Sequence, residues 1–100
     1  MGIQVSKSED SNLVTISVNG RFDFSLHKAF REAYKNEPAT TPFVVNMSGA
    51  DYMDSSALGM LLMLREHLDS NVASVRIEGC QPAIRQILEI SKFEKLFEIA

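Results

Sequence analysis

Carboxylate and hydroxyl side chains directly precede an apolar helical pattern in the segment 51–62, DYMDSSALGMLL. Ser55 and Ser56 are expected at the N-terminus of that helix, where backbone N–H groups lack intrahelical partners and the helix dipole is positive. Such a position accepts a carboxylate cap or a phosphate group. Two alternatives follow: Asp54 or Ser55 only caps the helix, a common role for these residue types, or Ser55, with Ser56 as second choice, is a phosphorylation switch.

The histidines do not suit catalysis at these serines. The sequence lacks the Gly-x-Ser-x-Gly turn of serine hydrolases and contains only His27 and His67. His67 is expected on the same helix as Ser55, about 18 Å further along its axis, which is too far for a general base. His27 is expected to be an exposed helix residue, because the sequence supplies no partner ligands for a metal site.

Three acidic residues raise the question of a magnesium site. Asp23, Asp51 and Asp54 have the oxygen ligands that Mg²⁺ prefers. However, the Gly-rich signatures of nucleotide-binding proteins are absent from the sequence. We therefore expect no metal, no cofactor and no catalytic residues, and a protein that binds a partner rather than an enzyme.

Length and composition predict one compact domain covering residues 1–100. The 100 residues are 45% hydrophobic, and a chain of this size buries roughly 60–65% of its unfolded surface. No run approaches the ~20 apolar residues that a membrane-spanning helix needs, and residues 1–10 do not resemble a secretory signal. We expect a soluble, cytoplasmic protein.

The charge and the cysteine content exclude several other classes of partner. The formal net charge is −3, and Lys and Arg form no cluster, so nucleic acid and anionic membranes are not expected partners. Cys80 is alone, which excludes an intramolecular disulfide and a thiolate cluster for zinc. Cys80 is expected to be a small packed residue.

The first half of the sequence predicts two strands and a helix. β-Branched residues at 3–6 and 13–18 indicate strands joined by a hairpin turn at 9–12, and Asn19-Gly20 is expected to end the second strand in a turn. Ser25 is the expected N-cap of a helix that ends before Pro38. The apolar face of that helix is expected to comprise Leu26, Ala29, Phe30, Ala33 and Tyr34.

The second half predicts strands and helices in alternation. The apolar run 43–47 indicates a strand buried on both faces, followed by a loop at 47–56 and a largely central helix at about 56–69. A further strand is expected at 72–78, and Pro82 suits the first turn of a third helix. Four apolar residues are expected to pack a short C-terminal element on the core: Phe93, Leu96, Phe97 and Ile99.

The order β-β-α-β-α-β-α plus a C-terminal element predicts an α/β fold. We expect a mixed sheet of four to five strands packed against about four helices, with crossover connections between parallel strands. Functional surfaces of such sheets lie at the carboxyl ends of the parallel strands. The predicted loop 47–56 lies at one of these ends.

Two segments resemble a STAS domain, and more narrowly the standalone bacterial anti-sigma factor antagonists. They are Asp54-Ser55-Ser56-Ala57-Leu58-Gly59 after the strand 43–47 and Gly20-Arg21-Phe22-Asp23 after the second strand, and the resemblance covers essentially the whole chain. It implies the STAS fold and phosphorylation of the hydroxyl residue directly after the Asp, which is Ser55. It also places Asp23 near this site, although Asp23 equally suits a helix cap. Ala57, where the family often has Gly, and the pattern around Asp23 are departures.

The resemblance implies a partner-switching function. The unmodified protein would bind an anti-sigma factor that is also a serine kinase of the histidine-kinase-like ATPase type, which frees a sigma factor for transcription. Phosphorylation would end this binding, and a PP2C-type serine phosphatase would restore it. Two alternatives stay open: control of biofilm, motility or secretion through a non-sigma target, and a structural subunit of a transport complex. The free protein is expected to be a monomer.

The partner-binding surface is expected around the phosphorylation site. Aromatic and Met side chains are favoured at interface centres, so Tyr52, Met53, Phe22 and Phe24 are candidate apolar anchors. Core packing is the alternative role. It is favoured over the anchor role for Phe22 and Phe24, and the two roles are equally expected for Tyr52 and Met53. The predicted surface comprises Asp23, Asp51, Tyr52, Met53, Asp54, Ser55 and Ser56.

Overall fold

A five-stranded mixed sheet forms the frame of the molecule. The computed structural model describes residues 2–69, 71 and 73–100. Within these residues the strands lie in chain order, β1-β2-β3-β4-β5, with β1 antiparallel to β2 and all other neighbours parallel. Their bounds are β1 Ile3–Lys7, β2 Val14–Phe22, β3 Phe43–Met53, β4 Val75–Glu78 and β5 Glu98–Ile99.

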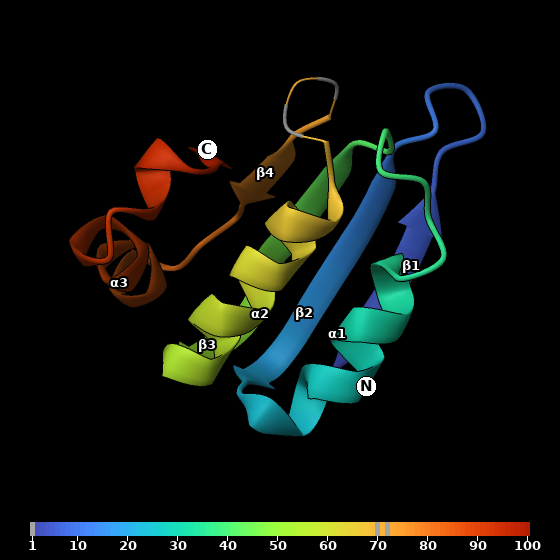
Figure 1. Ribbon diagram of the computed structural model, residues 1–100. Helices are drawn as coiled ribbons and strands as arrows, with labels where there is room; N and C mark the ends of the chain where they lie inside the picture. Colours follow the sequence, from blue (N-terminus) through green and yellow to red (C-terminus); the bar gives the residue numbers. More distant parts are fainter. Residues whose placement is uncertain (1, 70, 72) are drawn as a thin grey trace.

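Helices connect the parallel strands. Figure 1 shows α1 and α2 lying across the same face of the sheet. The described residues form three α-helices and two 3₁₀ turns: η1 Phe24–Leu26, α1 His27–Tyr34, α2 Ser55–His67, α3 Pro82–Ile90 and η2 Phe93–Lys95. The predicted order of elements is confirmed, and the predicted C-terminal element consists of η2 and β5. No helix in the described part of the chain is both long and apolar enough to cross a bilayer.

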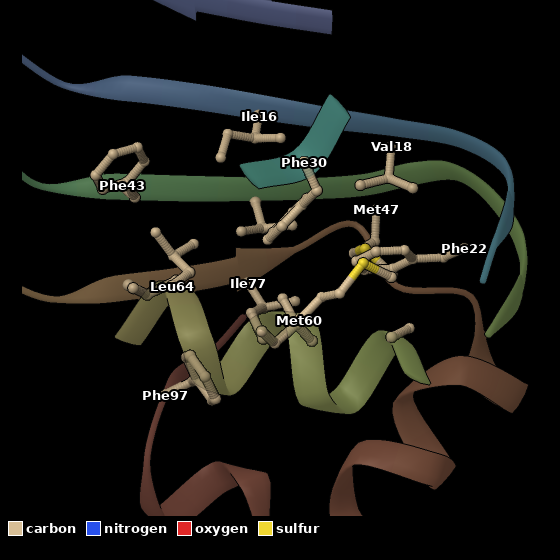
Figure 2. Packing of buried hydrophobic residues seen from close by; sticks show 14 of the residues in the cluster. Ile16, Val18, Phe22, Phe30, Phe43, Met47, Met60, Leu64, Ile77 and Phe97 are labelled. Carbon is tan, nitrogen blue, oxygen red and sulfur yellow. The ribbon is translucent and has the colours of Figure 1, made fainter. Parts of the chain in front are cut away.

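The core lies between one face of the sheet and the helices. Figure 2 shows Ile16, Val18 and Phe43 from the strands facing Phe30 and Leu64 from the helices. All five are at most 1% exposed. Because side chains alternate along a strand, the intervening residues point to the opposite face.

The opposite face of the sheet is polar and only partly covered. Val44 and Asn46 on β3 are half-buried, so the prediction that 43–47 is buried on both faces is wrong. Consecutive parallel strands joined by crossovers of one hand place all their helices on one face. The other face therefore carries charged pairs, in which Arg76 lies 3.3 Å from Glu78 and 3.8 Å from Glu98.

Strands β2 and β3 are longer than predicted. Asn19-Gly20 does not end β2: Gly20 adopts φ 79° and the register with β3 shifts between Ser17 and Asn19 and again between Gly20 and Arg21. A bulge of this kind bends a strand without ending it, and Gly is the residue that tolerates positive φ there. The predicted loop at 47–56 is also wrong, since β3 continues to Met53.

The start of the first helical region differs from the prediction. Ser25 is not the N-cap; the Asp23 side chain accepts a hydrogen bond from the Ser25 N–H and caps η1, and α1 begins at His27. The intervening 3₁₀ turn rotates the helix so that Ala29 is exposed. Phe30 is buried as expected and packs against Phe22, with 5.4 Å between ring centroids.

The C-terminal half follows the predicted pattern closely. Pro82 is the first residue of α3, and Phe93 and Phe97 are buried with ring centroids 5.4 Å apart. Leu96 is exposed instead of packed. The expected strand at 72–78 begins at Val75, and Val72 lies outside the described residues.

Two neighbouring positions on α2 test the division between core and surface. Leu64 is fully buried and Met63 is 49% exposed. Leu64→Ala is expected to lower the free energy of unfolding by about 2–5 kcal/mol through lost apolar burial and a cavity, and Met63→Ala by less than about 1 kcal/mol. Urea denaturation measures both values. Equal losses for the two variants would contradict the packing described.

Candidate functional site

The ends of β2 and β3 place two aspartates in equivalent positions. Phe22 pairs with Met53 in the parallel register, and Asp23 and Asp54 follow these paired residues. Both aspartates have extended backbones, with φ −135° and −123°. Each begins a helical segment, so both carboxylates lie at the same edge of the sheet.

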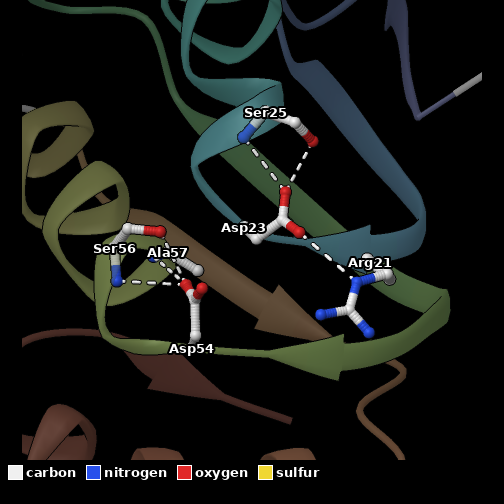
Figure 3. A network of polar contacts seen from close by, with 6 residues as sticks. All are labelled: Arg21, Asp23, Ser25, Asp54, Ser56 and Ala57. Atoms are coloured by element: carbon white, nitrogen blue, oxygen red, sulfur yellow. Dashed lines mark hydrogen bonds and ion pairs between the residues drawn. The ribbon is translucent and has the colours of Figure 1, made fainter.

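Asp54 is the N-cap of α2. Its Oδ1 accepts hydrogen bonds from the N–H groups of Ser56 at 3.1 Å and Ala57 at 3.2 Å (Figure 3). They belong to the first turn of the helix, where N–H groups need acceptors, and the Ala57 N–H also donates to the Asp54 carbonyl oxygen at 3.1 Å. The carboxylate lies favourably at the positive end of the helix dipole. The capping role predicted for Asp54 is therefore confirmed.

The two serines at the start of α2 have different environments. Ser56 is half-buried, and its hydroxyl donates to Asp54 Oδ1 at 2.6 Å. Ser55 is the first residue of α2 and its side chain is exposed. The hydroxyl of Ser56 thus belongs to the cap, whereas Ser55 is an exposed residue.

Asp23 repeats this capping geometry one strand away. Its Oδ1 accepts from both the N–H and the hydroxyl of Ser25, and its Oδ2 accepts from Arg21 Nε at 3.4 Å (Figure 3). The Ser25 hydroxyl, followed by the Ser25 N–H, holds the pKa of Asp23 below its ordinary value of 3.8. The carboxylate is ionised at neutral pH and adds a negative charge to this edge of the sheet.

Arg21 links the two strand ends through Tyr52. Its guanidinium carbon lies 3.8 Å from the centroid of the Tyr52 ring, and the two residues are register partners on β2 and β3. A cation stacked on an aromatic face at this distance is attracted by the ring quadrupole. Tyr52 remains 37% exposed and Asp51 is also exposed, so both are available to a partner.

Burial divides the four candidate apolar anchors between core and surface in a way that differs from the sequence prediction. Phe22 is fully buried, as favoured, and Met53 is 5% exposed and joins the core. Met53 is therefore withdrawn from the predicted partner-binding surface. Phe24 is 67% exposed, so the core packing favoured for it is wrong. The 3₁₀ turn directs Phe24 outward, where its ring stacks on His27 with 5.0 Å between centroids.

A groove that sequence reasoning missed adjoins the serines. It lies between the η1–α1 segment and α2, has a volume of about 450 Å³, and is lined by Phe24, His27, Ser56, Gly59, Met60, Leu62, Met63 and Glu66. The sequence signal that could have indicated this groove was the apolar pattern of α2, which covers more of the helix surface than one buried face requires.

The other chemical candidates are not brought together. His67 Nε2 lies 2.7 Å from the carbonyl oxygen of Glu37, at the opposite end of α2 from Ser55. Among the described residues, no three His, Cys, Asp or Glu side chains could hold a metal ion together. Cys80 is half-buried, and burial raises the pKa of its thiol, which makes a reactive thiolate less available.

Comparisons with known sequences give one family. The sequence model of the STAS domain matches residues 4–100. A protein of Pseudomonas aeruginosa (strain UCBPP-PA14), described as a STAS-domain containing protein, is 47% identical over 102 residues, which span 100% of both chains.

Solved structures share the fold. The anti-sigma factor antagonist SpoIIAA in its unphosphorylated form has a TM-score of 0.71 at 18% identity, covering 98% of this chain and 86% of that chain. SpoIIAA from Bacillus in its phosphorylated form has a TM-score of 0.73 at 19% identity, covering 98% and 90%. A sulfate transporter family protein from Wolinella succinogenes has a TM-score of 0.74 at 16% identity, covering 87% and 75%.

The N-cap of α2 can be tested by removing its acceptor. Asp54→Ala is expected to lower the free energy of unfolding by about 1 kcal/mol, because the Ser56 N–H loses its carboxylate acceptor and the Ala57 N–H keeps only the backbone carbonyl of residue 54. Asp54→Asn keeps an acceptor oxygen and should retain most of the stability. Urea denaturation compares the two variants, and equal stability of wild type and Asp54→Ala would contradict the capping role.

The hydrogen bonds of Asp23 at the cap of η1 predict how its pKa responds to substitution. Ser25→Ala is expected to move the pKa of Asp23 up towards 3.8, and Arg21→Gln to move it by less, because the Ser25 bonds are the larger cause. Since the folded-state pKa is depressed, the cap stabilises the protein above pH 3.8 and this contribution is lost as the pH falls through the folded pKa. Carbon-detected NMR titration of the Asp23 carboxyl measures the shift. An unchanged pKa in Ser25→Ala would contradict the assignment.

Proposed function

Because this chain belongs to the STAS domain family, we propose that it is an anti-sigma factor antagonist switched by phosphorylation of Ser55. The observation that carries the proposal is the exposure of Ser55 at the first position of α2, directly after the capping Asp54. A kinase can reach the Ser55 hydroxyl without breaking the cap. Ser56 is the second choice because its hydroxyl is bonded to Asp54.

A phosphate on Ser55 is compatible with the folded domain. It adds roughly −1.5 to −2 charge at neutral pH, and the positive end of the α2 dipole lies at this residue. The side chain is exposed, so no core contact is displaced. The similar TM-scores of this chain to unphosphorylated and phosphorylated SpoIIAA, 0.71 and 0.73, support a modification that leaves the fold in place.

The effect of the phosphate would appear at the partner interface. A hydrated, multiply charged group would need to be desolvated against a surface shaped for a hydroxyl. The carboxylates of Asp23, Asp51 and Asp54 lie at the same end of the strands and add further negative charge beside the phosphate. An interface penalty of about 4 kcal/mol would weaken binding roughly a thousandfold. We therefore propose a binding switch rather than a conformational one.

The proposed partners follow from this function. The unphosphorylated protein binds an anti-sigma factor that is a serine kinase of the histidine-kinase-like ATPase type, and a PP2C-type phosphatase reverses the modification. The contact surface we propose comprises the exposed or half-buried residues around the switch, which are Asp23, Asp51, Tyr52, Asp54, Ser55 and Ser56. The protein itself acts in the cytoplasm by binding and not by catalysis.

A second candidate function is a subunit of a transport complex. The fold similarity to a sulfate transporter family protein favours it. In that case the domain would be structural, and Asp54 and Ser55 would serve only as the N-cap and the first residue of α2. Copurification separates the two functions: a kinase or phosphatase supports the switch, and a transporter subunit supports the structural role.

Mass spectrometry of the protein from its native cells tests the switch. We expect one phosphate on the peptide containing Ser55, lost in Ser55→Ala and retained in Ser56→Ala, which is the matched control. Ser55→Ala should also keep the partner bound in pulldown experiments, whereas Ser55→Asp should release it because the carboxylate imitates part of the phosphate charge. Absence of phosphate on Ser55 under growth, stress and starvation would contradict the proposal.

A further inference from the structure

Three features of the groove between η1–α1 and α2 distinguish it from ordinary surface. Phe24 and Met63 line it with large apolar side chains that remain 67% and 49% exposed. The Phe24 ring stacks on His27, which also lines the groove. Met60 and Leu62 continue the apolar lining towards the core. Exposed apolar side chains that gather at one concave place indicate an interaction surface.

Gly59 gives the groove an open side. It lies inside α2 and is exposed, and a Cβ added there would meet no atom within 4 Å. Gly is among the least favourable residues in a helix interior, and neither packing nor backbone conformation requires it here. Because Gly59 has no side chain, α2 is uncovered at this point and another backbone can approach it closely.

The shape of the groove favours a helix as its occupant. Its lining follows α2 from Ser56 to Glu66, about 15 Å at ~1.5 Å per residue. A small molecule would keep one side in solvent, because the walls Phe24 and Met63 are themselves largely exposed. An amphipathic helix of about three turns instead covers such a groove with side chains at the 3–4 spacing.

The two ends of the groove differ in charge. Glu66 is the acidic residue among those that line it, and it lies near the C-terminus of α2. At the other end Ser56 adjoins the proposed Ser55 switch, and its hydroxyl donates to Asp54 Oδ1, which already accepts from two N–H groups of α2 and so does not require a cation from a partner. A complementary partner therefore carries Lys or Arg at the Glu66 end and uncharged side chains at the serine end.

We propose that this groove is the docking site for an amphipathic helix of the partner protein, with a basic residue opposite Glu66 and a small-side-chain contact at Gly59. The inference rests on the proposed function for the identity of the partner, because the groove reaches the switch at Ser56. A phosphate on Ser55 then lies beside the uncharged end of the docked helix. The groove determines where the partner binds, and the switch determines whether it binds.

A synthetic helix of defined chemistry tests the groove. The probe is a peptide of about four helical turns with Leu at the 3–4 spacing and one Lys at the end that meets Glu66. NMR titration of labelled protein should give shifts concentrated at Phe24, Gly59 and Met63. The control peptide has the same composition with the Leu positions scrambled, and it should bind at least about tenfold more weakly. Equal binding, shifts elsewhere, or no shifts would overturn the proposal.

Three variants test the chemistry of the site. Gly59→Ala is expected to raise the urea midpoint of the free protein, since Ala favours helix, and yet to weaken peptide binding at least about tenfold by filling the close approach. Met63→Glu should weaken binding similarly. Ile90→Glu on α3, where Ile90 is 72% exposed and outside the groove, adds the same charge and should leave binding unchanged. Unchanged binding in Gly59→Ala and Met63→Glu would overturn the inference.

A charge exchange tests the orientation and separates this inference from the proposed function. Glu66→Lys should weaken binding of the Lys peptide, and a peptide with Glu in place of Lys should restore it; failure of this rescue would overturn the basic contact. Ser55 phosphorylation is measured separately by mass spectrometry. Groove binding without phosphate on Ser55 would contradict only the switch, whereas a Ser55 switch with an inert groove would contradict only the docking site.

Discussion

The edge of the sheet that carries Asp23 and Asp54 depends on the parallel pairing of β2 and β3 beyond the bulge at Asn19-Gly20. Without the shift in register, β2 would end near Val18, as its local turn signal suggests. With it, the strands continue together until Phe22 pairs with Met53. Two buried side chains thus anchor the strand ends, and the next residue of each strand is an aspartate. The capping sites of η1 and α2 are neighbours for this reason.

The two caps give the serine hydroxyl groups different roles. A carboxylate that follows an extended strand accepts the first free N–H groups of the helix, and in both places it also binds the hydroxyl of the serine two residues later, Ser25 or Ser56. These hydroxyls support folding. Ser55 is exposed at the positive end of α2, so a charge can be added there without a change in the core.

The placement of all helices on one face of the sheet explains the groove. α2 lies at the centre of that face and needs apolar side chains towards the sheet and towards its neighbours α1 and the C-terminal elements. The 3₁₀ turn η1 then moves the chain away from the first turns of α2 and directs Phe24 outward. The space between them keeps Met63 and Gly59 accessible, which continues the proposed partner surface along the helix.

The sequence alone determined the order of the elements, the family resemblance and the cap at Asp54, because these depend on local patterns: apolar periodicity, turn residues and an acid before a helix. It did not determine the length of β2 and β3, the outward direction of Phe24 or the burial of Met53. Those depend on pairing between strands far apart in the chain, which outweighed the turn preference of Asn19-Gly20. The difference between Ser55 and Ser56 also required the structure, since two adjacent residues of the same type differ only in their exposure and in the bond that Ser56 makes to Asp54.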